Sequence, residues 1–296
     1  MLKYYLKELL NVMFIVTPLC AVVGIALASR YVRINLLDAF LLLLAMAFAN
    51  MAVDTLNDYA DFKKGIDFET VHTKFSGGPV TLLVEGKIKP KPTLAMALAV
   101  FSMALIIGAY FVIRVPLLAY IVVIGAVTIL IYSKFLLYTR ALAEPMLALI
   151  YMLVPLGSYI AMIGSASHLL SALFVSIPVG IIVALVLLIN EVPDRNVDKK
   201  HGRKSIAVLV YDIKKISRIY LSFQIVSLLI LLIGVLAGFV PFVALLAFLA
   251  IPFMLKAYSG FGKYKNPKQF EKYMGADVAY FLSFVILLSI GLFLHL

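Results

Sequence analysis

The chain is poor in charge: only 14% of its 296 residues are Asp, Glu, Lys or Arg, against about 25% in an average soluble domain. It has no tryptophan and a single cysteine, Cys20, which excludes an internal disulfide. Apolar residues make up 64% of the chain, and the mean hydropathy is +1.07. This composition excludes an ordinary soluble protein and predicts a protein that crosses the membrane several times.

Apolar segments of the length that crosses a bilayer, about 20 residues, recur along the whole chain. They predict an all-α membrane protein with nine transmembrane helices in a single domain, residues 1–296. The first segment lacks a small-residue cleavage site, so we expect a retained helix rather than a signal peptide. The predicted spans are 11–29, 35–58, 93–113, 116–133, 143–164, 169–190, 219–238, 241–257 and 276–296.

Basic residues are distributed unevenly between the two sides that nine spans define. With the N-terminus inside, 23 of the 26 Lys and Arg fall in inner segments, and only Arg30, Arg33 and Arg114 fall outside. Cytoplasmic loops carry such an excess. We therefore expect a cell-membrane protein with a cytoplasmic N-terminus and an outer C-terminus. The same placement argues that the net charge of +11 reflects membrane topology rather than nucleic-acid binding.

An acidic strip ends the second predicted span, just before the long inner loop at about 62–92. Asp54, Asn57, Asp58 and Asp61 fall within about 100° of one another on an α-helix. Carboxylates in this position are costly and usually mark function. For Asp67, in contrast, a solvated helix end is the simpler interpretation.

A second acidic strip follows the sixth predicted span and opens the other long inner loop, about 191–218. Asp194 and Asp198 are four residues apart, so they share a helix face. Pro193 removes a backbone hydrogen bond and should kink or restart the helix. Strips four spans apart, both ending inside, predict two four-helix halves plus a ninth helix around a central cavity.

Two facing strips of carboxylates repel each other unless a cation lies between them. Mg²⁺ prefers oxygen ligands and usually combines one or two carboxylates with substrate phosphates. The sequence therefore predicts a magnesium-diphosphate site on the cytoplasmic side, where neighbouring basic residues bind the remaining phosphate oxygens. These are Lys63, Lys64, Lys74, Arg195, Lys199 and Arg203.

The two strips resemble the paired motifs of the UbiA superfamily of intramembrane prenyltransferases. The matching residues are Asn57-Asp58-Tyr59-Ala60-Asp61, Lys64-Gly65-Ile66-Asp67, Asp194-x3-Asp198 and Gly202. The Lys-Gly-x-Asp ending and the spacing from Asn190 to Gly202 are most similar to the MenA branch, which prenylates 1,4-dihydroxy-2-naphthoate. Asp54 departs from this branch, which commonly has Asn at that position.

The resemblance implies a UbiA-like fold and Mg²⁺-dependent transfer of an isoprenyl group from a polyprenyl diphosphate to an aromatic acceptor. For the MenA branch the acceptor is 1,4-dihydroxy-2-naphthoate, in menaquinone biosynthesis. The candidate catalytic carboxylates are Asp54, Asp58, Asp61, Asp194 and Asp198. The resemblance implies two Mg²⁺ ions, the first on Asn57 and Asp61, the second on Asp194 and Asp198. The candidate diphosphate-binding residues are Lys74, Tyr132, Ser133, Lys134 and Arg195.

Two alternatives stay open. The acceptor can instead be an isoprenoid glyceryl phosphate, as in archaeal ether lipid synthesis. A cation transporter is the alternative from another class, because intramembrane carboxylates also mark ion paths. Transporters place such acids nearer the middle of the membrane, and we expect no mid-span acid in spans 1, 3, 4, 7, 8 and 9.

Overall fold

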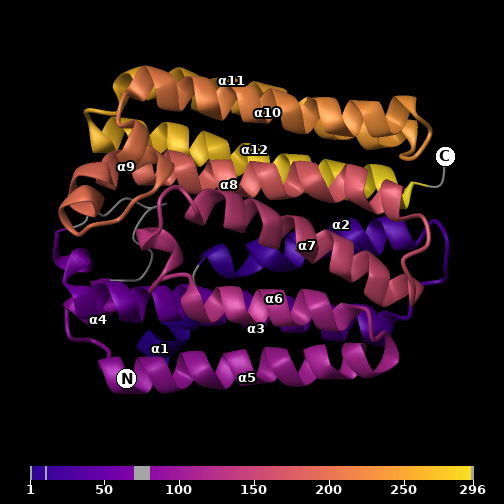
Figure 1. The fold of residues 1–296 in the computed structure, drawn as a ribbon, viewed down its shortest axis with the longest axis horizontal. Coiled ribbons are helices and arrows are strands. Elements are labelled where there is room, and N and C mark those ends of the chain that lie inside the picture. The colour runs from indigo at the N-terminus through magenta and orange to yellow at the C-terminus, as the bar shows by residue number, and fades with distance from the viewer. Residues whose placement is uncertain (1, 11, 70–80, 295–296) are drawn as a thin grey trace.

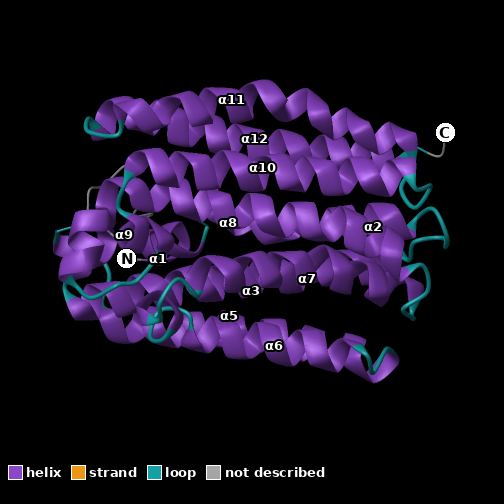
Figure 2. Ribbon diagram, turned by 45° about the horizontal axis from the view of Figure 1, so that its top comes forward, coloured by secondary structure: helices purple, strands orange, loops and turns teal. Residues whose placement is uncertain are grey.

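A computed structural model describes residues 2–10, 12–69 and 81–294 as a bundle of long helices (Figure 1). No strand occurs in these residues (Figure 2). Seven of their helices are long and apolar enough to cross a membrane, and α2 and α6 are shorter apolar helices. The predicted all-α membrane fold is therefore confirmed.

Each of the nine predicted spans corresponds to one apolar helical segment among the described residues. The segments are η1 with α2 (Val12–Ile15, Val16–Ala28), α3 (Leu36–Lys64), α5 (Pro90–Arg114), α6 (Leu118–Ile131), α7 (Ala143–Ile163), α8 (Leu169–Lys200), α10 (Ile213–Leu236), η5 with α11 (Phe242–Ala250, Ile251–Ser259) and α12 (Pro267–Phe293).

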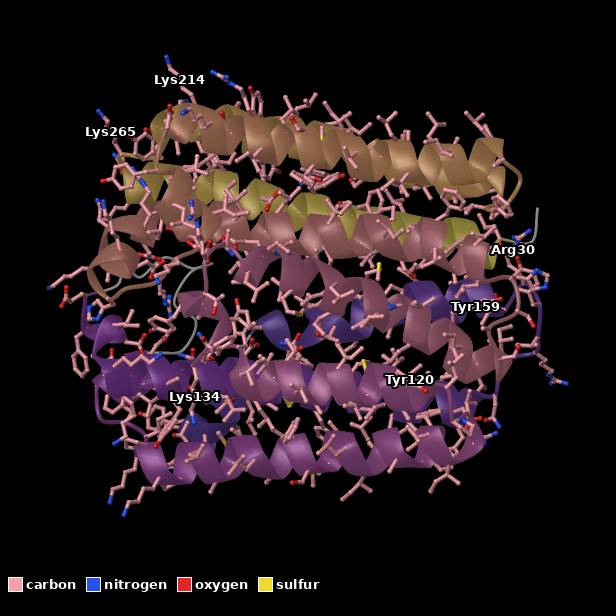
Figure 3. The ribbon with its side chains drawn as sticks, viewed as in Figure 1. Arg30, Tyr120, Lys134, Tyr159, Lys214 and Lys265 are labelled. Carbon is pink, nitrogen blue, oxygen red and sulfur yellow. The ribbon has the colours of Figure 1, made fainter. Side chains whose placement is uncertain are left out.

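Short helices precede or connect these segments, and the polar connections gather at one end of the bundle. The short helices are α1 (Leu2–Leu9), η2 (Ile66–Phe68), α4 (Thr81–Val84), η4 (Leu136–Tyr138), α9 (Ile206–Val210) and η6 (Gly260–Lys263). Lys134, Lys214 and Lys265 lie at this end, whereas Arg30 lies at the opposite end (Figure 3). The uneven distribution of Lys and Arg in the sequence thus corresponds to one strongly basic end of the bundle and one with few basic residues.

Both helices that bear the acidic strips are longer than the predicted spans. The Asn35 side chain caps α3 by accepting hydrogen bonds from the backbone N–H groups of Leu37 and Asp38, and α3 ends at Gly65, whose φ is +77°. Its 29 residues extend about 43 Å, beyond a hydrocarbon core of about 30 Å. Helix α8 does not restart at Pro193 but runs on to Lys200. Both strips therefore lie on continuous helix.

Helix α12 begins well before the predicted ninth span, so Asp277 lies inside the helix rather than near its start. Asp277 is fully buried, and its Oδ1 accepts a hydrogen bond of 2.5 Å from the hydroxyl of Tyr220 on α10. The sequence analysis expected no mid-span acid in this span, but Asp277, the second residue of the predicted span, lies well inside the longer helix. Hydropathy marks the apolar part of a membrane helix, whereas the first turns of α12 contain Lys268, Glu271 and Lys272.

Glycines let α2 and α8 approach α7 closely. A Cβ atom at Gly24 would lie 2.0 Å from the carbonyl oxygen of Pro155, and one at Gly180 would lie 2.2 Å from that of Ala148. We expect Gly180→Ala to lower the free energy of unfolding by about 1–3 kcal/mol, because the two backbones must separate. Thermal unfolding in detergent measures this loss.

Gly125→Ala is the matched control for that substitution. Gly125 also lies within a membrane helix, α6, but a Cβ atom there meets nothing within 4 Å. Its melting temperature should equal or slightly exceed that of the wild type, since alanine favours the helix. Equal melting temperatures for the two variants would show that the α7–α8 contact does not depend on Gly180.

Candidate active site

A cavity of about 490 Å³ lies inside the bundle, enclosed mainly by α3, α5, α6, α7 and α8. This volume is in the range of small-molecule sites. Most of the wall is apolar, and the polar residues gather toward the end where the acidic strips lie. The apolar lining includes Leu42, Met46, Phe101, Leu105, Phe111, Ile121, Val122, Ile129, Leu153 and Phe281.

Both acidic strips line this cavity, so the structure brings them together as the sequence predicts. The lining carboxyl groups are those of Asp54, Asp58, Asp61, Asp67, Glu191, Asp194 and Asp198. Arg203 joins the two strips: its guanidinium donates to Asp61 on α3 and, over 3.0 Å, to Oδ1 of Asp198 on α8. It is the one Lys or Arg among the described residues that line the cavity.

The position of Arg203 is set by the turn that ends α8. Gly202 has a φ of +80°, which favours glycine, and the backbone N–H of Arg203 donates to the carbonyl of Asp198 over 2.9 Å. Although burial alone would lower it, the carboxylates of Asp61 and Asp198 raise the pKa of Arg203. The guanidinium is therefore a permanent cation between the two strips.

Asn57 is held by the connection that follows α6. The Ser133 hydroxyl donates to Oδ1 of Asn57 over 2.9 Å, and Nδ2 of Asn57 donates to Oδ2 of Asp61 over 3.3 Å. Nζ of Lys64 donates to the carbonyl of Ser133 over 3.0 Å. Tyr132, the neighbour of Ser133, lines the cavity. The predicted Tyr-Ser pair is thus next to the α3 strip.

Asp54 belongs to a polar network that the sequence analysis missed. Nδ2 of Asn50 donates to Oδ2 of Asp54 over 2.8 Å. The amide oxygen of Asn50 in turn accepts from the hydroxyls of Thr17 and Tyr151. Asn50 lies four residues before Asp54, so the shared helix face could have revealed it.

Glu8 is a second residue that the sequence analysis missed. It lies on α1, is 1% exposed, and neither carboxyl oxygen has a hydrogen-bond partner among the described residues. Burial, with a smaller contribution from the Asp54 carboxylate, raises the pKa of Glu8 to about 7, against the effect of Asp58. Burial and the Asp61 carboxylate likewise raise the pKa of Asp67 to about 8, against the effect of Arg203. Among the described residues, this end of the cavity therefore has more carboxyl groups than Arg203 alone neutralises.

Glu144 and Glu191 form a buried pair of carboxyl groups beside the strips. Oε1 of Glu144 accepts a hydrogen bond from the backbone N–H of Ile206, and Glu191 lines the cavity. Neither residue is among the candidate site residues of the sequence analysis. Glu144 ties α7 to the segment that follows Arg203.

Two predicted phosphate-binding residues, Arg195 and Lys134, do not line the cavity, and a third lies outside the part of the chain that the structure describes. The Arg195 guanidinium lies 4.6 Å from the ring centre of Tyr264 and donates to the carbonyl of Val192. Lys134 is exposed at the end of the bundle (Figure 3). Lys74 lies outside the described residues. Among the described basic residues, Arg203 takes the place predicted for Arg195.

The donor set of the two strips fits magnesium. Among the described residues, no three His, Cys, Asp or Glu side chains form a closed metal cage. Mg²⁺ does not require one, because phosphates and waters complete its shell of hard oxygen ligands. Oδ1 of Asp61 is buried without a hydrogen-bond partner, and Arg203 already bridges the strips as a cation. Asn57, Asp61, Asp194 and Asp198 supply the kind of oxygen atoms that such an ion requires.

Comparisons with known proteins agree with this geometry. The model of the UbiA prenyltransferase family matches residues 17–288. The 1,4-dihydroxy-2-naphthoate octaprenyltransferase of Bacillus subtilis (strain 168) is 27% identical over 273 residues, which are 91% of this chain and 85% of that protein.

Solved structures show the same fold. The apo structure of a UbiA homolog from Aeropyrum pernix K1 has a TM-score of 0.71 at 19% identity and covers 94% of this chain and 96% of that chain. A UbiA homolog from Archaeoglobus fulgidus, bound to GPP and Mg²⁺, has a TM-score of 0.52 at 15% identity and covers 97% and 99%. The resemblance that the paired motifs indicate is confirmed. This chain belongs to the UbiA prenyltransferase family.

Proposed function

We propose that this prenyltransferase transfers an isoprenyl group from a polyprenyl diphosphate to 1,4-dihydroxy-2-naphthoate, with Mg²⁺, as a step of menaquinone biosynthesis. One observation carries the proposal: two facing carboxylate strips lie at the polar end of an otherwise apolar cavity. Such a cavity accommodates an ionic head and an apolar tail together. The naphthoate acceptor is supported by the name of the Bacillus subtilis relative.

The donor diphosphate binds at the acidic end in this proposal. Asn57 and Asp61 would hold one Mg²⁺, and Asp194 and Asp198 a second. When bound, Mg²⁺ neutralises the charge that develops on the departing diphosphate. Arg203 and the Tyr132 hydroxyl lie on the same part of the cavity wall and can donate to phosphate oxygens.

The apolar wall determines what happens after the allylic C–O bond breaks. The electron pair of the C–O bond leaves with the diphosphate, and a ring carbon of the acceptor forms the new C–C bond to the allylic carbon. The same ring carbon then loses its proton to a carboxylate at the acidic end, and the ring becomes aromatic again. Water would capture the allylic cation, and an apolar lining such as Leu105, Phe101 and Ile129 excludes it. Asp54, oriented by Asn50, is placed to accept hydrogen bonds from hydroxyl groups of the acceptor.

We also propose that the basic end of the bundle faces the cytoplasm, following the excess of Lys and Arg there. The N-terminus lies at this end, and the chain leaves the bundle at the opposite end (Figure 1). The C-terminus is then outside, and the acidic end of the cavity opens toward the cytoplasm.

Purified protein tests the proposal with labelled geranylgeranyl diphosphate and a panel of acceptors. We expect product with 1,4-dihydroxy-2-naphthoate in the presence of Mg²⁺, no detectable product after EDTA treatment, and recovery when Mg²⁺ is restored. The physical reason is that the carboxylates alone repel diphosphate.

The acceptor panel separates the alternatives. Product with an isoprenoid glyceryl phosphate but not with the naphthoate would replace the proposed acceptor. Product with 4-hydroxybenzoate alone would do the same. Flux of Mg²⁺ or Na⁺ into proteoliposomes, without any prenyl transfer, would support the transporter instead.

A further inference from the structure

We propose that Arg203 is an internal counter-ion that bridges the two acidic strips in the metal-free protein and competes with Mg²⁺ for Asp61 and Asp198. The inference rests on the proposed magnesium site. It concerns the binding of the metal itself, which can be measured without donor or acceptor.

The bridge is built from two strong contacts. Arg203 donates through one terminal nitrogen to Oδ2 of Asp61 and through the other to Oδ1 of Asp198. The Arg203 side chain is 13% exposed, and those of Asp61 and Asp198 are 7% and 3% exposed. A planar guanidinium suits this role, because its fork can serve two carboxylates at once. Asp61 and Asp198 are two of the four residues assigned to the metal.

The charges around the bridge require such a cation. Seven carboxyl groups and one basic side chain line the described part of the cavity. Two ionised carboxylates facing each other in a poorly solvated site repel strongly, and leaving either one buried and unpaired is costly. Arg203 therefore joins the two strips while the metal is absent.

The backbone holds Arg203 in this position. The N–H of Lys204 donates to the carbonyl of Leu137 over 2.9 Å, and the N–H of Ala141 donates to the carbonyl of Lys204 over 2.8 Å. The Glu144 carboxylate accepts from the N–H of Ile206. These contacts fix the backbone after Arg203 against η4 and α7, so a change of partner needs only its side chain to move.

Competition between two cations has a measurable consequence. Mg²⁺ alone must displace the guanidinium from Asp61 or Asp198, or bind beside it against repulsion. A diphosphate that arrives with the metal gives the displaced guanidinium a new anionic partner. Arg203 therefore weakens the binding of Mg²⁺ alone and favours its binding together with diphosphate, which is a coupling between two ligands.

Mg²⁺ titration of the melting temperature, with no other ligand, tests the proposal. In EDTA we expect Arg203→Ala to melt below the wild type, because Asp61 and Asp198 lose their partner. Mg²⁺ should then bind the variant about tenfold more tightly than the wild type, a difference of about 1.4 kcal/mol. Arg203→Lys, which keeps the charge but loses the fork, should give an intermediate affinity.

Two further variants separate this role from general damage. Lys200→Ala removes a cation that pairs with Glu69, and its Mg²⁺ affinity should equal that of the wild type. Adding Asp61→Asn to Arg203→Ala should remove the gain, since the metal loses a ligand. A merely structural arginine would lower the melting temperature equally with and without Mg²⁺. Unchanged or weaker Mg²⁺ binding in both Arg203 variants would overturn the proposal, whatever the outcome of the prenyl-transfer assay.

Discussion

Replacing Asp61 or Asp198 with alanine is expected to lower the rate of prenyl transfer by about a thousandfold or more, the loss typical of removing one preorganised charge-stabilising group. Each residue is one side of the bridge at Arg203 and one of the proposed ligands of a separate Mg²⁺. Without either residue, only the Mg²⁺ on the other strip neutralises the charge on the departing diphosphate. Single-turnover measurements with labelled donor at saturating Mg²⁺ quantify the loss.

Asp38→Asn is the matched control, because Asp38 is also a buried acid on α3. It lies at the opposite end of the helix, where its Oδ1 accepts hydrogen bonds from Arg114 over 2.6 Å and from Tyr110 over 2.7 Å. This variant should lose stability and keep the turnover of its folded fraction. Undiminished turnover in Asp61→Ala or Asp198→Ala would remove the proposal that both strips hold metal.

Hydrophobic segments and the spacing of carboxylates were sufficient to predict the bundle and the meeting of the two strips. They did not determine which arginine enters the cavity. Arg195 follows Asp194 by one residue on a continuous helix, so it points about 100° away from the acidic face. The sequence analysis expected the helix to kink or restart at Pro193, and the direction of Arg195 could not be predicted on that assumption. Arg203 enters through the left-handed turn at Gly202. A turn of this kind sets a direction that helical spacing does not encode.

Glu8 shows a different limit. Its short helix, α1, has only eight residues, and the position of such a helix follows from tertiary packing rather than from its own pattern. The partly buried rings of Tyr4 and Tyr5 pack against Leu82, Leu83 and Ile88. A contact between segments so far apart in the chain has no local signal. Without it, an isolated Glu near the N-terminus resembles any solvated acid.

The apolar part of the cavity yields the second large expected effect, which concerns the length of the prenyl donor. Gly125 lines the cavity on α6, and a Cβ atom there meets nothing within 4 Å. The ring introduced by Gly125→Phe would therefore occupy the space proposed for the tail. We expect kcat/KM for geranylgeranyl diphosphate to fall about a hundredfold, since losing apolar contact with even one methylene costs tenfold or more. For dimethylallyl diphosphate, whose tail ends near the diphosphate, kcat/KM should change little.

Val123→Phe distinguishes a blocked tail from a disturbed helix. Val123 lies two residues earlier on the same helix, is 59% exposed and does not line the cavity, so a larger side chain there extends toward lipid. Both donors should keep their wild-type kcat/KM in this variant. An equal fall for both donors in Gly125→Phe would mean that the ring disturbs the acidic end rather than the tail. No fall for either donor would place the tail elsewhere and leave the acidic strips as the only part of the cavity that the substrate uses.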